Sequence, residues 1–281
     1  MTFEWSASDL EQFRKVQRLA YDCVTDVERR LGAGMTEKQV AGLMDAYLRE
    51  HGVVEYFHKP FVWFGDRTAF VDFRTDFAFF PTNGRLAWGM PVILDVAPTL
   101  EGYAADIGYS CCFGENALLS RMQRDLLEYR SLVLEGVKKE RTLREIYREL
   151  DRVIARDGYV NRHQRYPNAV LAHRVTRVAP TLLGRVTLGC FGISALRFFD
   201  RELRAFKGGM AAHGPFWNGE PSSERRATPG IWAVEPHIGC QGVGSKWEEL
   251  LVVTDTDAYW LDDDLPHHRR GVARTGRVAE A

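Results

Sequence analysis

The sequence lacks three features, and each absence excludes a class of protein. No uninterrupted apolar stretch approaches the roughly 18 residues that a membrane-spanning helix needs, so we expect no contact with a membrane. The chain carries almost no net charge, with 37 basic and 38 acidic residues, so no overall field points to nucleic acid or to an anionic surface. The five cysteines show no Cys-x-x-Cys spacing, which argues against a cysteine metal site and favours free thiols in a reducing compartment.

The start of the chain also lacks a targeting signal, because residues 1–9 contain neither a basic segment nor an apolar core. We therefore expect a soluble, cytoplasmic protein. The composition is that of a globular protein, with 45% hydrophobic and 12% aromatic residues. The 281 residues suffice for one large domain or two small ones.

Capping signals followed by apolar residues at helical spacing predict two pairs of helices. The predicted helices cover residues 8–32, 36–52, 118–137 and 143–154, and the capping pairs are Ser8 with Glu11, Thr36 with Gln39, and Thr142 with Glu145. Strand-like runs follow each pair: 53–64 and 68–80, with Asn83-Gly84 as a hairpin signal, and later 230–236, 247–254 and 258–261. This order indicates a duplicated α+β unit, although no sequence repeat is visible.

The least regular stretch lies between residues 157 and 228, where glycine, proline and arginine are frequent. We expect loops, one short helix and an insertion there. The basic tail after Leu265 is predicted to be disordered. His267 and His268 are accordingly interpreted as tail residues rather than ligands.

The most informative stretch is residues 91–110, in which two strand-like runs flank a turn at residues 98–102. A hairpin centred between Leu100 and Glu101 would place Asp95 directly opposite Asp106, where like charges repel. Asp95 also lies in a run apolar enough to be buried, which is costly for a carboxylate unless it is paired or binds metal. One or two divalent cations would offset both the repulsion between the aspartates and the cost of burying Asp95. A register slip that turned one aspartate to solvent would instead leave an ordinary surface hairpin.

Two later strands each contain a glutamate within an apolar run, Glu235 and Glu248. Taken singly, such a glutamate usually lies on the wet face of its strand, and a lone His173 is more often structural than a ligand. His173, Glu235 and Glu248 follow the two aspartates in this order along the chain, and the order indicates that the five residues belong to one site.

Asp95, Asp106, His173, Glu235 and Glu248 together resemble the metal ligands of the pita-bread metallopeptidases, family M24, which contains methionine aminopeptidase, prolidase, aminopeptidase P and creatinase. The resemblance covers about residues 8–262 and rests on three motifs: aspartates eleven positions apart in Leu94-Asp95 and Ala105-Asp106-Ile-Gly, then Pro229-Gly-Ile-Trp-Ala-Val-Glu235-Pro236, and Glu248-Glu-Leu-Leu-Val-Val-Thr254. It implies an α+β pita-bread fold, in which duplicated αα-ββ units form a curved antiparallel sheet covered by helices.

The resemblance also implies a domain organisation. A single catalytic domain would cover residues 1–265, with an insertion at about 178–212 and a disordered tail at 266–281. The separate amino-terminal domain of prolidase and creatinase would be missing, and the likeness to prolidase suggests a homodimer.

The activity implied is that of a metallohydrolase with two divalent ions, Mn, Co, Fe or Zn, because carboxylates are hard bridging donors and one imidazole does not select among these metals. Two ions that share a water lower its pKa toward about 7 and polarise a carbonyl, so that a metal-bound hydroxide attacks an amide of a short peptide or amino-acid-like substrate. Glu235 matches the family's acid/base, which passes the water proton to the leaving amine.

The sequence departs from the family's pattern at three places. Arg174 follows His173 where the family has glycine, and it is a candidate to hold a substrate carboxylate, with a solvent-facing side chain as the alternative. The histidine that binds the scissile carbonyl is matched to His213, which makes residues 178–212 an insertion and a candidate lid. A third family histidine is replaced by Asp72, which would favour a cationic or amine group, and His58 is the other candidate for that position.

Three functions compete on these observations. The first is a Xaa-Pro peptidase or aminopeptidase acting on a short peptide. The alternative, favoured by Arg174 and Asp72, is a creatinase-like hydrolase or lyase acting on a small zwitterionic metabolite. A metal-free binding protein on the same fold is disfavoured, because a binding surface has no need to bury four carboxylates together.

Overall fold

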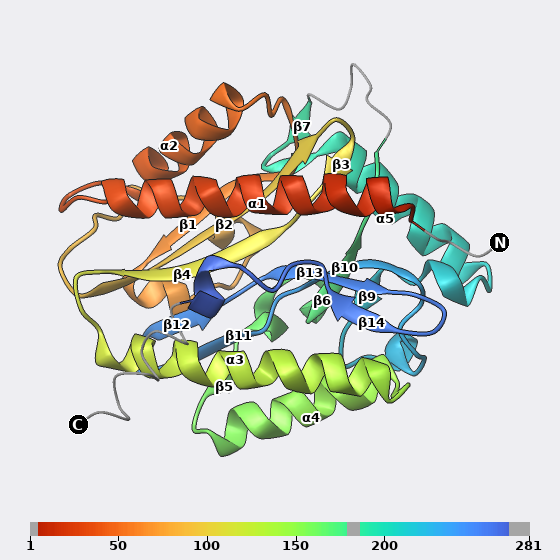
Figure 1. The fold of residues 1–281 in the computed structure, drawn as a ribbon. Helices are drawn as coiled ribbons and strands as arrows, with labels where there is room; N and C mark the ends of the chain where they lie inside the picture. The colour runs from red at the N-terminus through yellow and green to blue at the C-terminus, as the bar shows by residue number, and fades with distance from the viewer. Residues whose placement is uncertain (1–4, 179–185, 270–281) are drawn as a thin grey trace.

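The computed structural model describes residues 5–178 and 186–269 of the chain. Two pairs of helices enclose the sheets, with α1 and α2 on one side and α3 and α4 on the other (Figure 1). The helices are α1 (Ala7–Arg30), α2 (Glu37–Glu50), α3 (Ala117–Lys138), α4 (Leu143–Arg156) and α5 (Ile193–Lys207). Each pair precedes its own group of strands, which confirms the predicted duplicated unit.

The strands form three sheets in which every named pair is antiparallel. The first has the order β3-β2-β1-β8-β7, with β4 also on β2: β1 (Glu55–Phe64), β2 (Met90–Leu100), β3 (Tyr103–Ala104), β4 (Ile107–Phe113), β7 (Thr187–Leu188) and β8 (Phe191–Gly192). The second has the order β14-β13-β10-β6-β9: β6 (Ala172–Val175), β9 (Phe216–Trp217), β10 (Gly230–Val234), β13 (Glu249–Val253) and β14 (Ala258–Trp260). The third contains β5 (Val160–Asn161), β11 (His237–Cys240) and β12 (Val243–Lys246).

The helix starts follow the capping signals with one correction. Thr36 with Gln39 and Thr142 with Glu145 form the predicted capping boxes. α1 is instead capped by Ser6 with Asp9, two residues before the predicted pair. Trp5, directly before this cap, packs edge-on against Phe13 at 4.9 Å between ring centroids, and this contact favours the earlier start.

The strand and hairpin predicted for residues 68–84 are wrong. This segment forms the short 3-10 helices η1 (Gly65–Ala69) and η2 (Asp76–Phe79) with loops around them. Arg67, which is paired with the buried carboxylate of Glu37, donates to the backbone carbonyls of Ala78 at 2.9 Å and Phe80 at 3.1 Å. The N–H of Thr82 donates to Glu37 at 2.7 Å, so backbone groups of the segment bond to side chains and not to a neighbouring strand. The aromatic residues of the segment pack as one cluster on β1 and β2, with Phe61, Trp63, Phe70, Phe73, Phe79 and Ile93 as its buried members.

The hairpin of β2 and β4 forms as predicted, but its register differs by two positions. Asp95 pairs with Gly108 rather than with Asp106, because the turn lies at Glu101 and Gly102, whose φ angles are 53° and 86°. A slip of two residues preserves the face of a strand, whereas a slip of one reverses it. Both aspartates therefore remain on the same side of the sheet.

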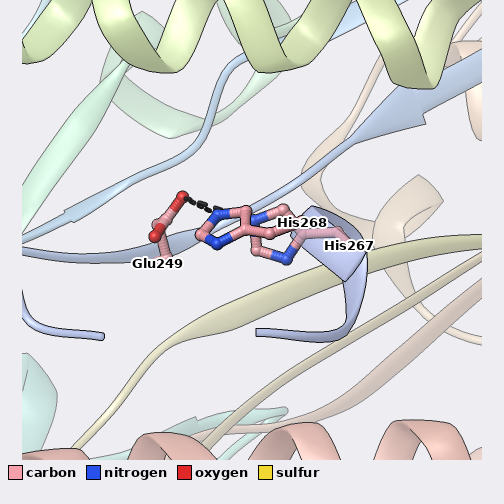
Figure 2. A group of neighbouring side chains, drawn as sticks. All are labelled: Glu249, His267 and His268. Atoms are coloured by element: carbon pink, nitrogen blue, oxygen red, sulfur yellow. Dashed lines mark hydrogen bonds and ion pairs between the residues drawn. The ribbon is translucent and has the colours of Figure 1, made fainter. Parts of the chain in front are cut away.

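The end of the described chain is ordered, contrary to the prediction for residues 266–269. These residues form a helical turn, and His267 and His268 each place Nε2 3.3 Å from Oε1 of the buried Glu249 (Figure 2). Arg130 donates Nε to the same oxygen at 2.7 Å, so the carboxylate already has a cationic partner. Residues 270–281 of the predicted tail, and 179–185 of the predicted insertion, lie outside the described residues.

Across residues 5–178 and 186–269, no helix combines the length and the apolar character needed to cross a membrane.

Candidate metal centre

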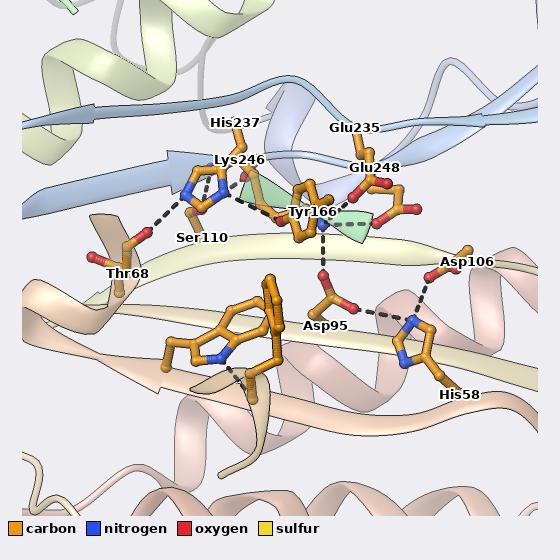
Figure 3. Close-up of polar contacts among 12 residues, drawn as sticks. His58, Thr68, Asp95, Asp106, Ser110, Tyr166, Glu235, His237, Lys246 and Glu248 are labelled. Atoms are coloured by element: carbon orange, nitrogen blue, oxygen red, sulfur yellow. Dashed lines mark hydrogen bonds and ion pairs between the residues drawn. The ribbon is translucent and has the colours of Figure 1, made fainter. Parts of the chain in front are cut away.

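Side chains from both halves of the chain converge in the interior (Figure 3). All five predicted ligands take part, and each is at most 9% exposed. The first half supplies His58 from β1, Asp95 from β2, and Asp106 from the residues before β4; the second supplies His173 from β6, Glu235 after β10, and Glu248 before β13. The described residues offer four groups that suit a cation; one is Glu249-His267-His268, and the three that overlap in this cluster are His58-Asp95-Asp106, Asp106-His173-Glu248 and Asp95-Glu235-Glu248.

Backbone hydrogen bonds fix the two glutamates at the ends of their strands. The N–H of Glu235 donates to the carbonyl of Leu171 at 2.8 Å, just before β6. The N–H of Glu248 donates to the carbonyl of Gly108 at 3.0 Å, which joins the second half of the chain to β4. The carboxylates are therefore positioned by the sheets rather than by loops.

Lys246 is a member of the cluster that sequence reasoning missed. Its Nζ lies 2.6 Å from Asp95 Oδ2, 2.9 Å from Glu235 Oε2 and 2.9 Å from Glu248 Oε2 (Figure 3). The side chain is fully buried, and the ring of Tyr166 lies 4.8 Å from the ammonium. One signal was available, because Lys246 precedes Glu248 by two residues and side chains two apart in extended chain share a face.

His58 is the second residue whose role the sequence left open. Its Nε2 lies 3.0 Å from Asp106 Oδ1 and 3.2 Å from Asp95 Oδ1, while Nδ1 lies 2.9 Å from the carbonyl oxygen of Lys59. Burial by itself lowers the pKa of His58, but the two carboxylates outweigh it and raise the pKa to about 9. His58, and not Asp72, is thus the candidate that faces the cluster.

His173 is oriented as a metal ligand requires. Its Nδ1 lies 3.2 Å from the carbonyl oxygen of Arg174, and Nε2 lies 3.1 Å from Asp106 Oδ2 and 3.7 Å from Glu248 Oε1. A histidine that donates Nδ1–H to a carbonyl presents the lone pair of Nε2. The neighbouring Glu248 Oε1 is buried and has no hydrogen-bond partner among the described residues.

A divalent ion fits this part of the cluster. An unsatisfied buried carboxylate oxygen is costly, and a cation at Asp106, His173 and Glu248 would satisfy it. Two carboxylates and an imidazole suit Mn, Co, Fe or Zn. The residues present therefore fit the metal that the sequence predicts, at this group.

Burial and charge act in opposite directions on the acids. Burial raises the pKa of Glu248 well above its usual range and also raises that of Glu235. Burial acts the same way on Asp106, but His58 and His173 outweigh it and hold the pKa of this carboxyl well below its usual range. Burial lowers the pKa of Lys246, but Asp95, Glu235 and Glu248 raise it well above the usual value, so its amine keeps its proton.

Three predicted substrate-binding residues lie elsewhere. Arg174 follows His173 in β6 and so faces the opposite side of the sheet, where its guanidinium donates to the carbonyls of Ala212 at 2.7 Å and Pro229 at 3.1 Å. The structure therefore shows neither the inward turn nor the solvent-facing side chain that the sequence left open for Arg174, which is 8% exposed. Asp72 is exposed, and His213 pairs with Glu202 through Nδ1 at 3.0 Å; no contact among the described residues joins either to the carboxylates.

The segment predicted as an insertion contributes aromatic side chains at the two histidines. Phe191 of β8 lies edge-on to His58, with ring centroids 6.3 Å apart. Phe199 of α5 lies edge-on to His173 at 5.6 Å, and Phe57 of β1 stacks on the same histidine at 6.2 Å. The cluster is thus bordered by apolar rings on the side of α5.

Duplicated αα-ββ units around antiparallel sheets, with acidic residues from both units meeting at the centre, define the pita-bread fold. The chain belongs to metallopeptidase family M24, whose model matches residues 11–255.

Known proteins similar to the chain are peptidases. It is 25% identical, over 155 residues, to an uncharacterized peptidase of Staphylococcus aureus (strain bovine RF122 / ET3-1), an alignment that covers 55% of this chain and 42% of the relative. The chain therefore spans less than half of that relative's length.

Solved structures share the fold at low sequence identity. An X-Pro aminopeptidase from Thermotoga maritima MSB8 superposes with a TM-score of 0.69 at 19% identity, covering 94% of this chain and 63% of that chain. The prolidase from Pyrococcus horikoshii OT3 superposes with a TM-score of 0.64 at 18% identity, covering 92% and 64%.

Proposed function

We propose that the protein is a metal-dependent hydrolase that cleaves an amide near the amino terminus of a short peptide, with Xaa-Pro peptides as the favoured class. The observation that carries the proposal is the convergence of Asp106, His173 and Glu248 around a buried carboxylate oxygen that has no hydrogen-bond partner in residues 5–178 and 186–269. These residues would hold a divalent ion such as manganese. When bound, such an ion lowers the pKa of a water and polarises a substrate carbonyl.

Glu235 is the proposed acid/base. Its Oε2 accepts from Lys246 at 2.9 Å, which fixes the carboxyl group next to the ligand set. Burial raises its pKa, so the carboxyl group holds a proton more readily than an exposed glutamate does. Glu235 would take the proton of the attacking water and deliver it to the leaving amine.

The surroundings favour a peptide with an apolar residue over a zwitterionic metabolite. Phe57, Phe191 and Phe199 would provide flat apolar contacts for a prolyl ring. The creatinase-like alternative depended on Arg174 and Asp72, and neither faces the cluster. Similarity to structures described as an X-Pro aminopeptidase and a Xaa-Pro dipeptidase supports the same class.

Turnover of a dipeptide panel tests the proposal. The protein loaded with Mn²⁺ or Co²⁺ is expected to hydrolyse Xaa-Pro dipeptides or tripeptides faster than matched Xaa-Ala peptides. Asp106→Asn should lose this activity with an unchanged circular dichroism spectrum, whereas Glu101→Gln, in the exposed turn of the same hairpin, should retain it. Absence of turnover of every peptide by the metal-loaded protein would refute the proposed function.

We also propose a cytoplasmic homodimer, as the family resemblance suggests. All five cysteines are free thiols, which fits a reducing compartment. Light scattering coupled to size-exclusion chromatography tests the dimer.

A further inference from the structure

The ammonium of Lys246 is held like a metal ion. An ammonium group has three N–H donors, and Lys246 directs them to one oxygen each of Asp95, Glu235 and Glu248 at 2.6, 2.9 and 2.9 Å. These three carboxylates are also one of the groups able to hold a cation. The side chain is fully buried, so water does not compete for these bonds.

Backbone architecture keeps Lys246 in this position. The N–H of Lys246 donates to Ser110 Oγ at 2.8 Å, and that hydroxyl donates to the carbonyl of Lys246 at 2.7 Å. The absence of a Cβ at Gly108 leaves room for the Lys246 side chain, since a Cβ there would lie 2.3 Å from Lys246 Cε and 3.0 Å from Nζ. An ordinary side chain at position 108 is therefore incompatible with the observed lysine position.

Charge and geometry together bear on how many divalent ions the cluster can hold. The four carboxylates carry four negative charges when ionised, and Lys246 supplies one positive charge. One divalent ion leaves the buried cluster with a single excess negative charge, whereas two ions would leave it positive even before either histidine is protonated. A buried excess charge of either sign is costly, so geometry decides: Lys246 already occupies oxygens of Asp95, Glu235 and Glu248. The Glu248 oxygen that has no hydrogen-bond partner among the described residues lies 3.7 Å from His173 Nε2, on the side of the remaining group.

We propose that Lys246 fills one of the two cation positions predicted from the sequence, so that the protein binds a single divalent ion at Asp106, His173 and Glu248. This inference rests on the proposed metal-dependent function and differs from the two-ion centre that the family resemblance implies. Lys246 acts as a built-in cation that bridges Asp95, Glu235 and Glu248.

Metal stoichiometry tests the inference independently of activity. The purified protein is stripped with chelator, dialysed to equilibrium against Mn²⁺ and analysed for bound manganese, with thermal unfolding followed in parallel. The wild-type chain is expected to bind one ion. Lys246→Met should bind two, and its unfolding temperature in chelator should fall and be restored by Mn²⁺, since three buried carboxylates then lack a cation.

Gly108→Ala provides a second route to the same result without removing the lysine. The added methyl group would displace the Lys246 side chain, and Gly108 has no left-handed φ that would strain an alanine. This variant is also expected to bind two ions. Lys139→Met is the matched control, because Lys139 is 68% exposed and pairs with Glu135 at the surface; it should bind one.

The outcomes separate the inference from the proposed function. Two ions in the wild-type chain, or one ion in both folded Lys246→Met and Gly108→Ala, would overturn the role of Lys246 while leaving a metal-dependent hydrolase intact. No bound ion in the wild-type chain would overturn both.

Discussion

Glu248 and Glu249 are neighbours in the chain, yet their carboxylates lie on opposite sides of the strand. Glu248 Oε2 is 2.9 Å from Lys246 Nζ, whereas Glu249 Oε1 is 2.7 Å from Arg130 Nε. The alternation of side chains in extended backbone separates a glutamate of the candidate metal centre from one that anchors α3 and the end of the described chain. The same substitution should therefore have different effects at the two positions.

We expect Glu248→Gln to abolish metal binding and hydrolysis while leaving the free energy of unfolding of the metal-free protein nearly unchanged or increased. The reason is that the substitution removes one of four clustered buried carboxylates. Glu249→Gln should lower the free energy of unfolding by about 3 kcal/mol, because Arg130 loses its buried partner. Urea denaturation of both variants measures these changes. Full activity in Glu248→Gln, or equal destabilisation of the two, would contradict the assignment.

Glu235→Gln should lower kcat by roughly 10²–10⁴-fold, the usual contribution of a general acid/base. Bound manganese should persist, because Asp106, His173 and Glu248 form a complete group without Glu235. Steady-state kinetics on a Xaa-Pro dipeptide, together with metal analysis, separates the two effects. Loss of the metal in this variant would show that Glu235 is needed for binding instead.

Phe199→Ala should raise KM for Xaa-Pro substrates roughly tenfold, as expected when one apolar contact to the substrate is removed, with a smaller change in kcat. Phe199 contacts His173 but belongs to none of the groups that suit a cation. Phe77→Ala is the control, because Phe77 is 77% exposed. An unchanged KM in Phe199→Ala would show that Phe199 of α5 does not contact the substrate.

Acid should destabilise the protein partly through His163. This side chain is fully buried, and burial lowers its pKa to about 3, compared with about 6.5 for an exposed histidine. Below pH 6.5 His163 binds a proton in the unfolded chain but stays neutral in the folded chain. The free energy of unfolding therefore falls by about 1.4 kcal/mol per pH unit until pH 3. In urea denaturation at several pH values, His163→Gln should remove this one-proton contribution from the slope of the free energy of unfolding against pH. His51→Gln, at an exposed position, should leave the slope unchanged.

Local signals in the sequence predicted much of the fold. The threonines at positions 36 and 142 cap their helices as expected, because a capping box depends only on residues within one turn. The two aspartates share a face although the predicted turn was misplaced, because the error was an even number of residues. The five predicted ligands also meet, but that set was implied by the resemblance to family M24 and not by a local signal.

The failures of prediction involve contacts between distant parts of the chain. The aromatic residues 68–80 favour a strand by propensity, but Arg67, which is paired with Glu37 of α2, binds the backbone carbonyls of Ala78 and Phe80. The position of Lys246 depends on the missing side chain of Gly108, and a glycine in a strand gives no sign of what occupies the space beside it. His267 and His268 lie in a basic segment, yet a buried acid of β13 orders them.

The division of the cluster between the two αα-ββ units has a practical consequence. His58, Asp95 and Asp106 precede α3, while His173, Glu235, Lys246 and Glu248 follow α4. Two fragments produced separately, divided between these helices, would each lack the complete Asp106-His173-Glu248 group, because Asp106 lies before the division and the other two residues lie after it. Restored manganese uptake on mixing would then report their reassembly, which makes the chain a natural scaffold for a split-protein reporter.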